Sequence, residues 1–155
     1  MKIQDLIHKN SIIIDLKNTN KTEVLDQMAR FLCSIHSIQD PDAISSNILE
    51  READMSTGIG FGIAIPHARF NGIDRLYMVA ARSVEGIEFN ALDEQPVHLI
   101  FMMISPASTS TEHTQILSSL SRIMSYEEVR KKLLQADTSE AFLDILTKSE
   151  DKYVE

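Results

Sequence analysis

The stretch VHLIFMMI, residues 97–104, is apolar at every position except His98. A strand with one solvated face alternates apolar and polar residues, whereas a strand covered on both faces is apolar almost throughout. This stretch therefore predicts a central strand of a sheet that carries helices on both faces. It is far shorter than the ~20 apolar residues that cross a bilayer, so we expect no insertion into a membrane.

Further strands are expected on both sides of this stretch in the sequence. Residues 76–83 form the preceding strand, and the connection from there to 97–104 lacks a helical pattern. Such a connection joins antiparallel strands, so the sheet is expected to be mixed. Residues 63–65 form a short strand that Pro66 ends, because proline cannot donate to a ladder. The other expected strands are 11–16 and 87–89, and residues 92–96 form a turn.

Helical segments alternate with these strands. Their expected starts are a capping box at 20–23, a cap and first-turn proline at Asp40-Pro41, a second capping box at 125–128, and a start at 137–140. A further helix runs from about Glu112 to Met124, after a loop that contains Pro106 and residues 108–111. The alternation predicts an α/β fold of three layers, an αβα sandwich with a mixed central sheet. We expect residues 1–155 to form a single domain.

Composition narrows the class of protein. A chain of 155 residues is long enough to bury a sizeable core. Its formal net charge of −8 argues against binding nucleic acid, while a basic protein partner and a merely solvated surface both fit this charge. Cys33 is the only cysteine, which excludes an intrachain disulfide, and the N-terminal residues lack the apolar run of a secretory signal. Both observations fit a protein of the reducing cytoplasm.

The segment GIGFGIAIPHAR, residues 58–69, delivers one histidine, His67, at the end of a glycine-rich stretch. The other histidines form no spacing typical of a metal site, so we expect no metal. The chain also lacks the serine elbow of hydrolases and the lysine motif of nucleotide-binding loops. A neutral imidazole can carry a covalent intermediate, and a phosphoryl acceptor needs donors around the phosphoryl oxygens.

Three parts of the chain offer such donors. Arg51 falls at the end of a predicted helix, Ser56 and Thr57 precede the glycine turn whose amides begin at Gly58, and His113 lies in the first turn of a helix. Backbone amides of a turn and of a helix N-terminus bind anions. Each also has a purely structural interpretation: Arg51 complements a helix dipole, the serine and threonine form a turn, and His113 is an exposed first-turn residue beside a capping signal at Thr109. The residues alone leave these alternatives open.

Six short sequence motifs, spread over the chain, resemble those of a known protein family. They are Arg51-Glu52, Ser56-Thr57-Gly58-Ile59-Gly60, Gly62-Ile63-Ala64-Ile65-Pro66-His67-Ala68, Leu92-Asp93-Glu94-Gln95-Pro96-Val97, Glu112-His113-Thr114 and Leu120-Ser121-Arg122. Together they resemble the enzyme IIA components of the bacterial phosphoenolpyruvate-dependent sugar phosphotransferase system, of the fructose, mannitol and nitrogen-regulatory type. The resemblance departs from the family pattern at Phe61, where asparagine is more common, at Glu94, where glycine is usual, and at Thr114, where leucine is common.

The resemblance implies a cytoplasmic phosphocarrier without cofactors. His67 would accept a phosphoryl group from the phosphohistidine of the small carrier protein HPr or of its nitrogen-branch counterpart. By position in the family, Arg51 and His113 would flank that group. An aromatic Phe61 at the rim of the site bears on the choice of partner.

Two branches of this function and one function of another class remain open. The chain carries no attached IIB-like or membrane segment, which favours a stand-alone regulatory protein that binds other proteins according to its phosphorylation state. A transport protein would instead pass the phosphoryl group to a IIB component for a fructose- or mannitol-like sugar. The alternative of another class is an anion-sensing or interaction module that keeps the fold without transfer.

Overall fold

The computed structural model describes residues 1–108 and 111–154. Within these ranges the strands are β1 Ile12–Ile13, β2 Gly58–Gly60, β3 Ile63–Ala64, β4 His67–Phe70, β5 Tyr77–Ile87 and β6 Val97–Pro106. The helices are α1 Lys21–His36, α2 Pro41–Asp54, α3 Thr111–Met124, α4 Glu127–Gln135 and α5 Ser139–Tyr153, with short 3-10 turns at Ile3–Asp5 and Lys9–Ser11. None of the helices in this described part combines the length and apolar character needed to span a bilayer.

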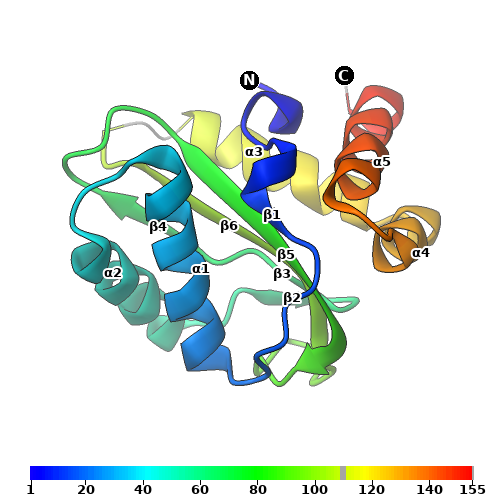
Figure 1. The fold of residues 1–155 in the computed structure, drawn as a ribbon, viewed down its shortest axis with the longest axis horizontal. Helices are drawn as coiled ribbons and strands as arrows, with labels where there is room; N and C mark the ends of the chain where they lie inside the picture. The colour runs from blue at the N-terminus through cyan, green and yellow to red at the C-terminus, as the bar shows by residue number, and fades with distance from the viewer. Residues whose placement is uncertain (109–110, 155) are drawn as a thin grey trace.

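Strand β6 lies in the middle of the sheet. The strand order is β1-β5-β6-β3-β2, and β4 also pairs with β6, beyond β3 (Figure 1). Strand β5 is antiparallel to β6, whereas β3 and β4 are parallel to it. The sheet is therefore mixed, as predicted from the connection between the two long strands.

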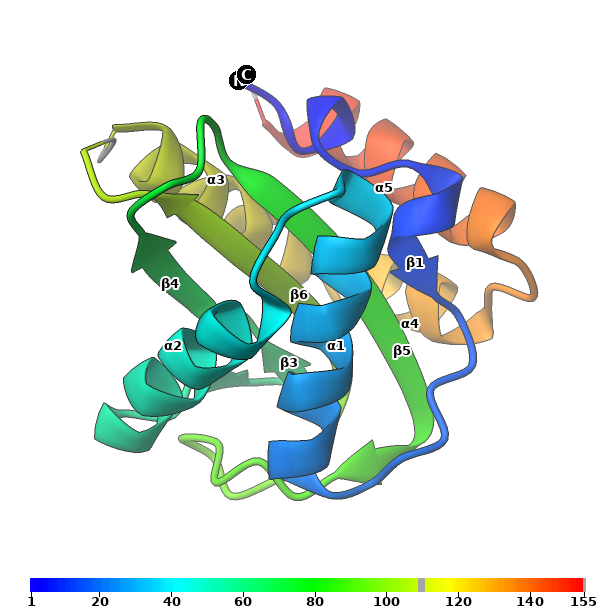
Figure 2. The same cartoon turned by 60° about the vertical axis from the view of Figure 1, so that its left-hand side comes forward.

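Alternate side chains of β6 enter two separate cores. Leu99, Phe101 and Met103 pack in the core formed with α3, α4 and α5. Ile100 and Met102 pack in the core formed with α1 and α2. Figures 1 and 2 show these two groups of helices on opposite faces of the sheet. The predicted αβα sandwich is thus confirmed, and its origin is the double burial of residues 97–104.

The prediction that the short strand ends at Pro66 is confirmed, because β3 ends at Ala64 and a separate strand, β4, begins at His67. Ile63 pairs with Leu99, and His67 pairs with Met103, so the same register continues across the proline. The carbonyl of Pro66 also accepts a hydrogen bond of 2.9 Å from the amide of Met103. The carbonyl of Pro66 points to β6, so the N–H that proline lacks would point there too, and the ladder is interrupted at this residue before pairing resumes at His67. His67 is therefore held within a paired strand.

Other sequence-based boundaries shift modestly. Only residues 12–13 of the expected strand 11–16 pair in the sheet, and the expected strand 87–89 contributes Ile87 alone, as the end of β5. Asn20 and Asp40 cap α1 and α2 as predicted, but Tyr126 rather than Ser125 is the N-cap of α4. Residues 109–110 of the predicted 108–111 loop, with the capping signal at Thr109, lie outside the described residues.

The chain ends are joined through a buried carboxylate. Glu150 in α5 is 2% exposed and accepts hydrogen bonds from the backbone amides of Ile3, at 2.6 Å, and Gln4, at 3.0 Å, and from the side-chain amide of Gln4. These amides belong to the first 3-10 turn, whose N–H groups have no partner inside the turn. Glu150 thus fastens the N-terminal segment onto the α3–α5 layer.

Glu150→Gln should lower the free energy of unfolding by about 1–3 kcal/mol, because an amide NH2 would face donors that need an acceptor. Chemical denaturation measures this change. The control is Asp151→Asn, which alters an exposed neighbour and should change stability by less than about 0.5 kcal/mol. Equal effects of the two substitutions would contradict the assigned role of Glu150.

Candidate functional site

His67 lies half-buried at the start of β4, at a pocket of about 380 Å³. The pocket is lined by Asn47, Arg51, His67, Ala68, Arg69 and His113. These residues come from three elements: α2, β4 and the first turn of α3. The structure thus brings together Arg51, His67 and His113, which are separated by 62 positions of sequence and were singled out from the sequence alone.

The ring of His67 is oriented by its own backbone. Its Nδ1 lies 2.7 Å from the carbonyl oxygen of Ile65. A carbonyl only accepts, so Nδ1 carries the proton in this contact. Burial lowers the pKa of His67 below its ordinary value, against the opposing effect of this hydrogen bond, and the ring is neutral near pH 7. A neutral imidazole with its proton on Nδ1 leaves a lone pair on Nε2.

His113 is the second imidazole of the pocket. It is 5% exposed, and its ring lies 5.0 Å from that of His67, centre to centre, with the planes nearly perpendicular at 71°. Its Nδ1 is 2.6 Å from the hydroxyl of Ser105 in β6. Burial, with the added effect of His67, Arg69 and Arg51, lowers the pKa of His113 to about 4. The structural alternative of an exposed first-turn residue is therefore wrong.

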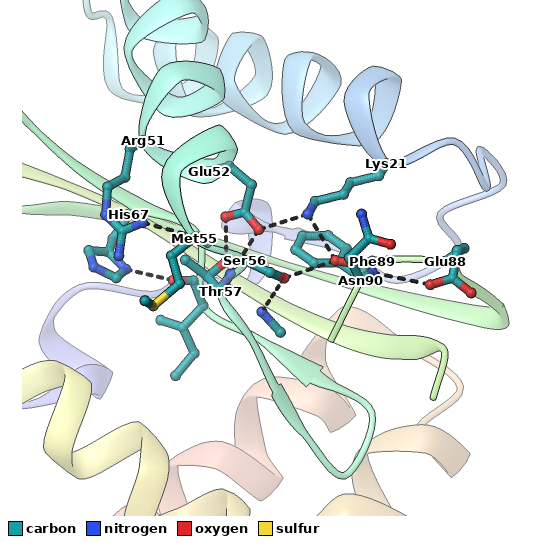
Figure 3. Close-up of polar contacts among 12 residues, drawn as sticks. Lys21, Arg51, Glu52, Met55, Ser56, Thr57, His67, Glu88, Phe89 and Asn90 are labelled. Atoms are coloured by element: carbon teal, nitrogen blue, oxygen red, sulfur yellow. Dashed lines mark hydrogen bonds and ion pairs between the residues drawn. The ribbon is translucent and has the colours of Figure 1, made fainter. Parts of the chain in front are cut away.

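Arg51 occupies the last turn of α2 and supplies the permanent positive charge. One guanidinium nitrogen donates to the carbonyl of Met55 at 3.1 Å. Figure 3 shows the side chain extended from the end of the helix to the ring of His67. A guanidinium has five N–H donors, and among residues 1–108 and 111–154 this is the one hydrogen bond found for Arg51, so other donors remain for an anion in the pocket that Arg51 lines.

Ser56, Thr57 and Gly58 lie beside this pocket. The first two line an adjoining groove of about 210 Å³ that Arg51 and His67 also line. Their donors are engaged within the protein: Thr57 donates through its amide and hydroxyl to Glu52, Ser56 donates to the carbonyl of Phe89, and the amide of Gly58 donates to the Ser56 hydroxyl (Figure 3). Their contribution to phosphoryl binding stays a prediction, and in this conformation their hydrogen bonds shape the wall of the groove.

Glu52 organises this wall and was not predicted to have a role. Its buried carboxylate accepts both hydrogen bonds from Thr57, at 2.8 and 2.7 Å, and lies 3.0 Å from the ammonium group of Lys21. Lys21 also donates to the carbonyl of Phe89 at 2.8 Å and lies over that aromatic ring. The network joins the start of α1 and the end of α2 to the turn at Ser56 and Thr57 and to the segment at Phe89 (Figure 3). It therefore holds the backbone that follows Arg51.

Two pocket residues were also missed from the sequence. Asn47 precedes Arg51 by one helical turn, and the i, i+4 spacing on α2 could have identified it. Arg69 follows His67 by two positions on β4, so strand periodicity places both side chains on the same face.

Phe61 occupies the tip of the β2–β3 hairpin. Its φ of 59° lies in the left-handed region, which asparagine tolerates better than phenylalanine. Its amide donates to Asp93, and the guanidinium of Arg130 lies 4.6 Å from the ring centre. The ring nevertheless remains 70% exposed. A strained backbone thus presents an aromatic surface at the hairpin tip.

The fold of the chain is that of an EIIA domain. The crystal structure of the nitrogen regulatory protein IIA-Ntr from Neisseria meningitidis matches with a TM-score of 0.87 at 28% identity, covering 93% of this chain and 98% of that one. The chain belongs to the family described as "Phosphoenolpyruvate-dependent sugar phosphotransferase system, EIIA 2", whose model matches residues 5–149. This confirms the family resemblance drawn from the motifs.

Two curated relatives bear fructose-specific names. The EIIA component of Haloferax volcanii is 45% identical over 109 residues, which are 70% of this chain and 71% of the relative. The EIIABC component of Bacillus subtilis is 38% identical over 146 residues, which are 94% of this chain but 23% of the relative. The chain therefore spans less than a quarter of that larger protein.

The depressed pKa of His113 makes stability depend on pH. Because the folded pKa, about 4, lies below the ordinary 6.5, the unfolded chain binds a proton that the folded chain does not between these values. Stability should therefore be fully present above pH 6.5 and decrease as the pH falls to 4, by on the order of 3 kcal/mol from this residue. In His113→Gln the decrease should be smaller, as measured by denaturant unfolding at several pH values. The same slope in both proteins would refute the burial of a neutral ring.

Proposed function

We propose that the protein is a phosphocarrier of the phosphotransferase system that accepts a phosphoryl group on Nε2 of His67. The single observation that supports this proposal best is the hydrogen bond from Nδ1 of His67 to the carbonyl of Ile65. It leaves Nε2 as the unprotonated, nucleophilic nitrogen of a neutral ring at a pocket that Arg51 also lines. The proposed donor is the phosphohistidine of HPr or of a nitrogen-branch counterpart.

The proposed step exchanges one N–P bond for another. The Nε2 lone pair of His67 attacks phosphorus, the N–P bond of the donor breaks, and the donor nitrogen keeps that electron pair. The phosphorylated donor and the phosphorylated product are both phosphoimidazoles, so the exchange is close to thermoneutral. The transferred group brings roughly −1.5 to −2 charges to a neutral ring. Arg51 offsets this charge, and its planar fork can bind two phosphoryl oxygens at once.

We propose that the protein acts in the cytoplasm, where this donor operates, and that one of two recipients follows. In the regulatory branch the phosphorylation state controls binding to other proteins, and the 28% identical IIA-Ntr structure supports this branch. In the transport branch a IIB component receives the group. The transport branch is the second candidate because the two fructose-specific relatives have identities of 45% and 38%.

Incubation with phosphoenolpyruvate, enzyme I and HPr tests the proposed function. We expect one acid-labile, base-stable phosphate per chain, absent from His67→Ala, with ¹⁵N NMR assigning the phosphate to Nε2. His98→Ala is a control, because His98 donates from Nδ1 to the Ser83 carbonyl away from the pocket. A folded wild-type protein that incorporates no phosphate would favour an anion-sensing module instead.

Arg51→Ala should slow phosphoryl acceptance by roughly 10²-fold, because it removes the fixed positive charge beside the developing phosphoryl charge. Single-turnover labelling by phosphorylated HPr measures this rate. Arg30→Ala is the matched control, since Arg30 is an exposed arginine paired with Asp26 and Asp42. The thermal midpoint should change little in either variant. A large loss of stability with normal transfer would instead assign Arg51 a structural role.

A further inference from the structure

Ser105 is a buried polar residue that the proposed transfer does not use directly. It lies in β6 as the cross-strand partner of Arg69, and it is completely buried. Its hydroxyl oxygen is 2.6 Å from Nδ1 of His113, a short distance for a neutral hydrogen bond. Ser105 therefore touches the second imidazole on the side of the sheet, and it is not among the residues that line the pocket.

The direction of this hydrogen bond follows from the burial of both partners. A hydroxyl proton at a fully buried site needs an acceptor, because an unsatisfied donor costs about 1–3 kcal/mol. Among the described residues, Nδ1 of His113 is the acceptor found within hydrogen-bond distance of this hydroxyl. If Nδ1 were the donor instead, the hydroxyl proton of Ser105 would have no such acceptor. The hydroxyl therefore donates and Nδ1 accepts.

The tautomer of His113 then follows. The ring is neutral near pH 7, and a neutral imidazole that accepts at Nδ1 carries its proton on Nε2. His67 has the opposite arrangement, since its Nδ1 is protonated by contact with the Ile65 carbonyl. The two rings lie 5.0 Å apart at one pocket, one with a lone pair on Nε2 and the other with an N–H there.

We propose that Ser105 is a positioning residue that fixes His113 as the Nε2–H tautomer, so that His113 donates a hydrogen bond to the phosphoryl group on His67. This proposal rests on the proposed function of His67. The other tautomer would turn a lone pair toward a phosphoryl oxygen, where two acceptors repel. Ser105 acts only through the ring of His113, and it needs no contact with the phosphoryl group.

The tautomer is measured by two-bond ¹H–¹⁵N correlation spectra of ¹⁵N-histidine-labelled protein at pH 7. In the wild type His113 should show the Nε2–H pattern and His67 the Nδ1–H pattern. In Ser105→Ala the His113 signals should move toward a mixture of tautomers. A wild-type His113 in the Nδ1–H form would overturn the proposal without any variant.

The effect of Ser105 on transfer is tested by comparing the rate of His67 phosphorylation in Ser105→Ala and Ser83→Ala. Ser83 is also completely buried, on the neighbouring strand β5, but its hydroxyl binds the amide of Gly86 instead of a histidine. Ser105→Ala should reduce the maximal rate of His67 phosphorylation by roughly 10-fold, with the KM for phosphorylated HPr unchanged, because one oriented donor is partly lost. Ser83→Ala should stay within twofold of the wild type.

Identical rates and identical His113 spectra in the two alanine variants would refute the role of Ser105. Ser105→Thr retains the hydroxyl and should preserve the wild-type tautomer, which separates loss of the donor from a general disturbance of the strand. If the wild-type protein takes up no phosphate at all, the proposed function fails. The spectra of the unphosphorylated protein still decide the tautomer in that case.

Discussion

The parallel pairing of residues 63–70 with β6 is the constraint on which the site depends. One register holds Ile63 opposite Leu99 and His67 opposite Met103, on both sides of a proline. Because side chains alternate between faces, this register turns Ile63, Ile65 and His67 toward the layer that contains α3. A shift of one residue would turn the imidazole toward α1 and α2 instead. The hydrophobic burial of β6 thus fixes the direction of a polar group.

The second feature of the site is the neutrality of its two imidazoles. Burial lowers the pKa of both rings, and the nearby arginines act in the same direction. Two charged rings 5.0 Å apart beside Arg51 would repel one another, and neither could serve as a nucleophile. A backbone acceptor at His67, the Ile65 carbonyl, and the proposed side-chain donor at His113, the Ser105 hydroxyl, then decide which nitrogen of each ring is protonated. The same burial that stabilises the fold near neutral pH therefore also prepares the chemistry proposed for the pocket.

The sequence predicted what depends on local pattern. The apolar run of β6, buried on both faces, and the caps at Asn20 and Asp40 can be recognised from residues that are adjacent in the sequence. These predictions are confirmed. The strand end at Pro66 was also predicted from the missing N–H, but that the chain resumes pairing with β6 at His67 in the same register depends on the folded sheet. Ser105 and Glu52 were not identified as part of the site, since each becomes significant only through contacts made in the folded chain. The proximity of Arg51, His67 and His113 was expected from family motifs and not from spacing.

Adjacent residues of opposite charge, Arg51 and Glu52, have separate surroundings. The carboxylate is enclosed with Lys21 and Thr57, whereas the contact found for the guanidinium, within the described ranges, is a backbone carbonyl. An entering anion therefore does not have to displace a resident counterion from Arg51. The electrostatic attraction is preorganised before an anion binds, and within the described part of the chain the Met55 carbonyl is the one acceptor that the guanidinium would have to exchange.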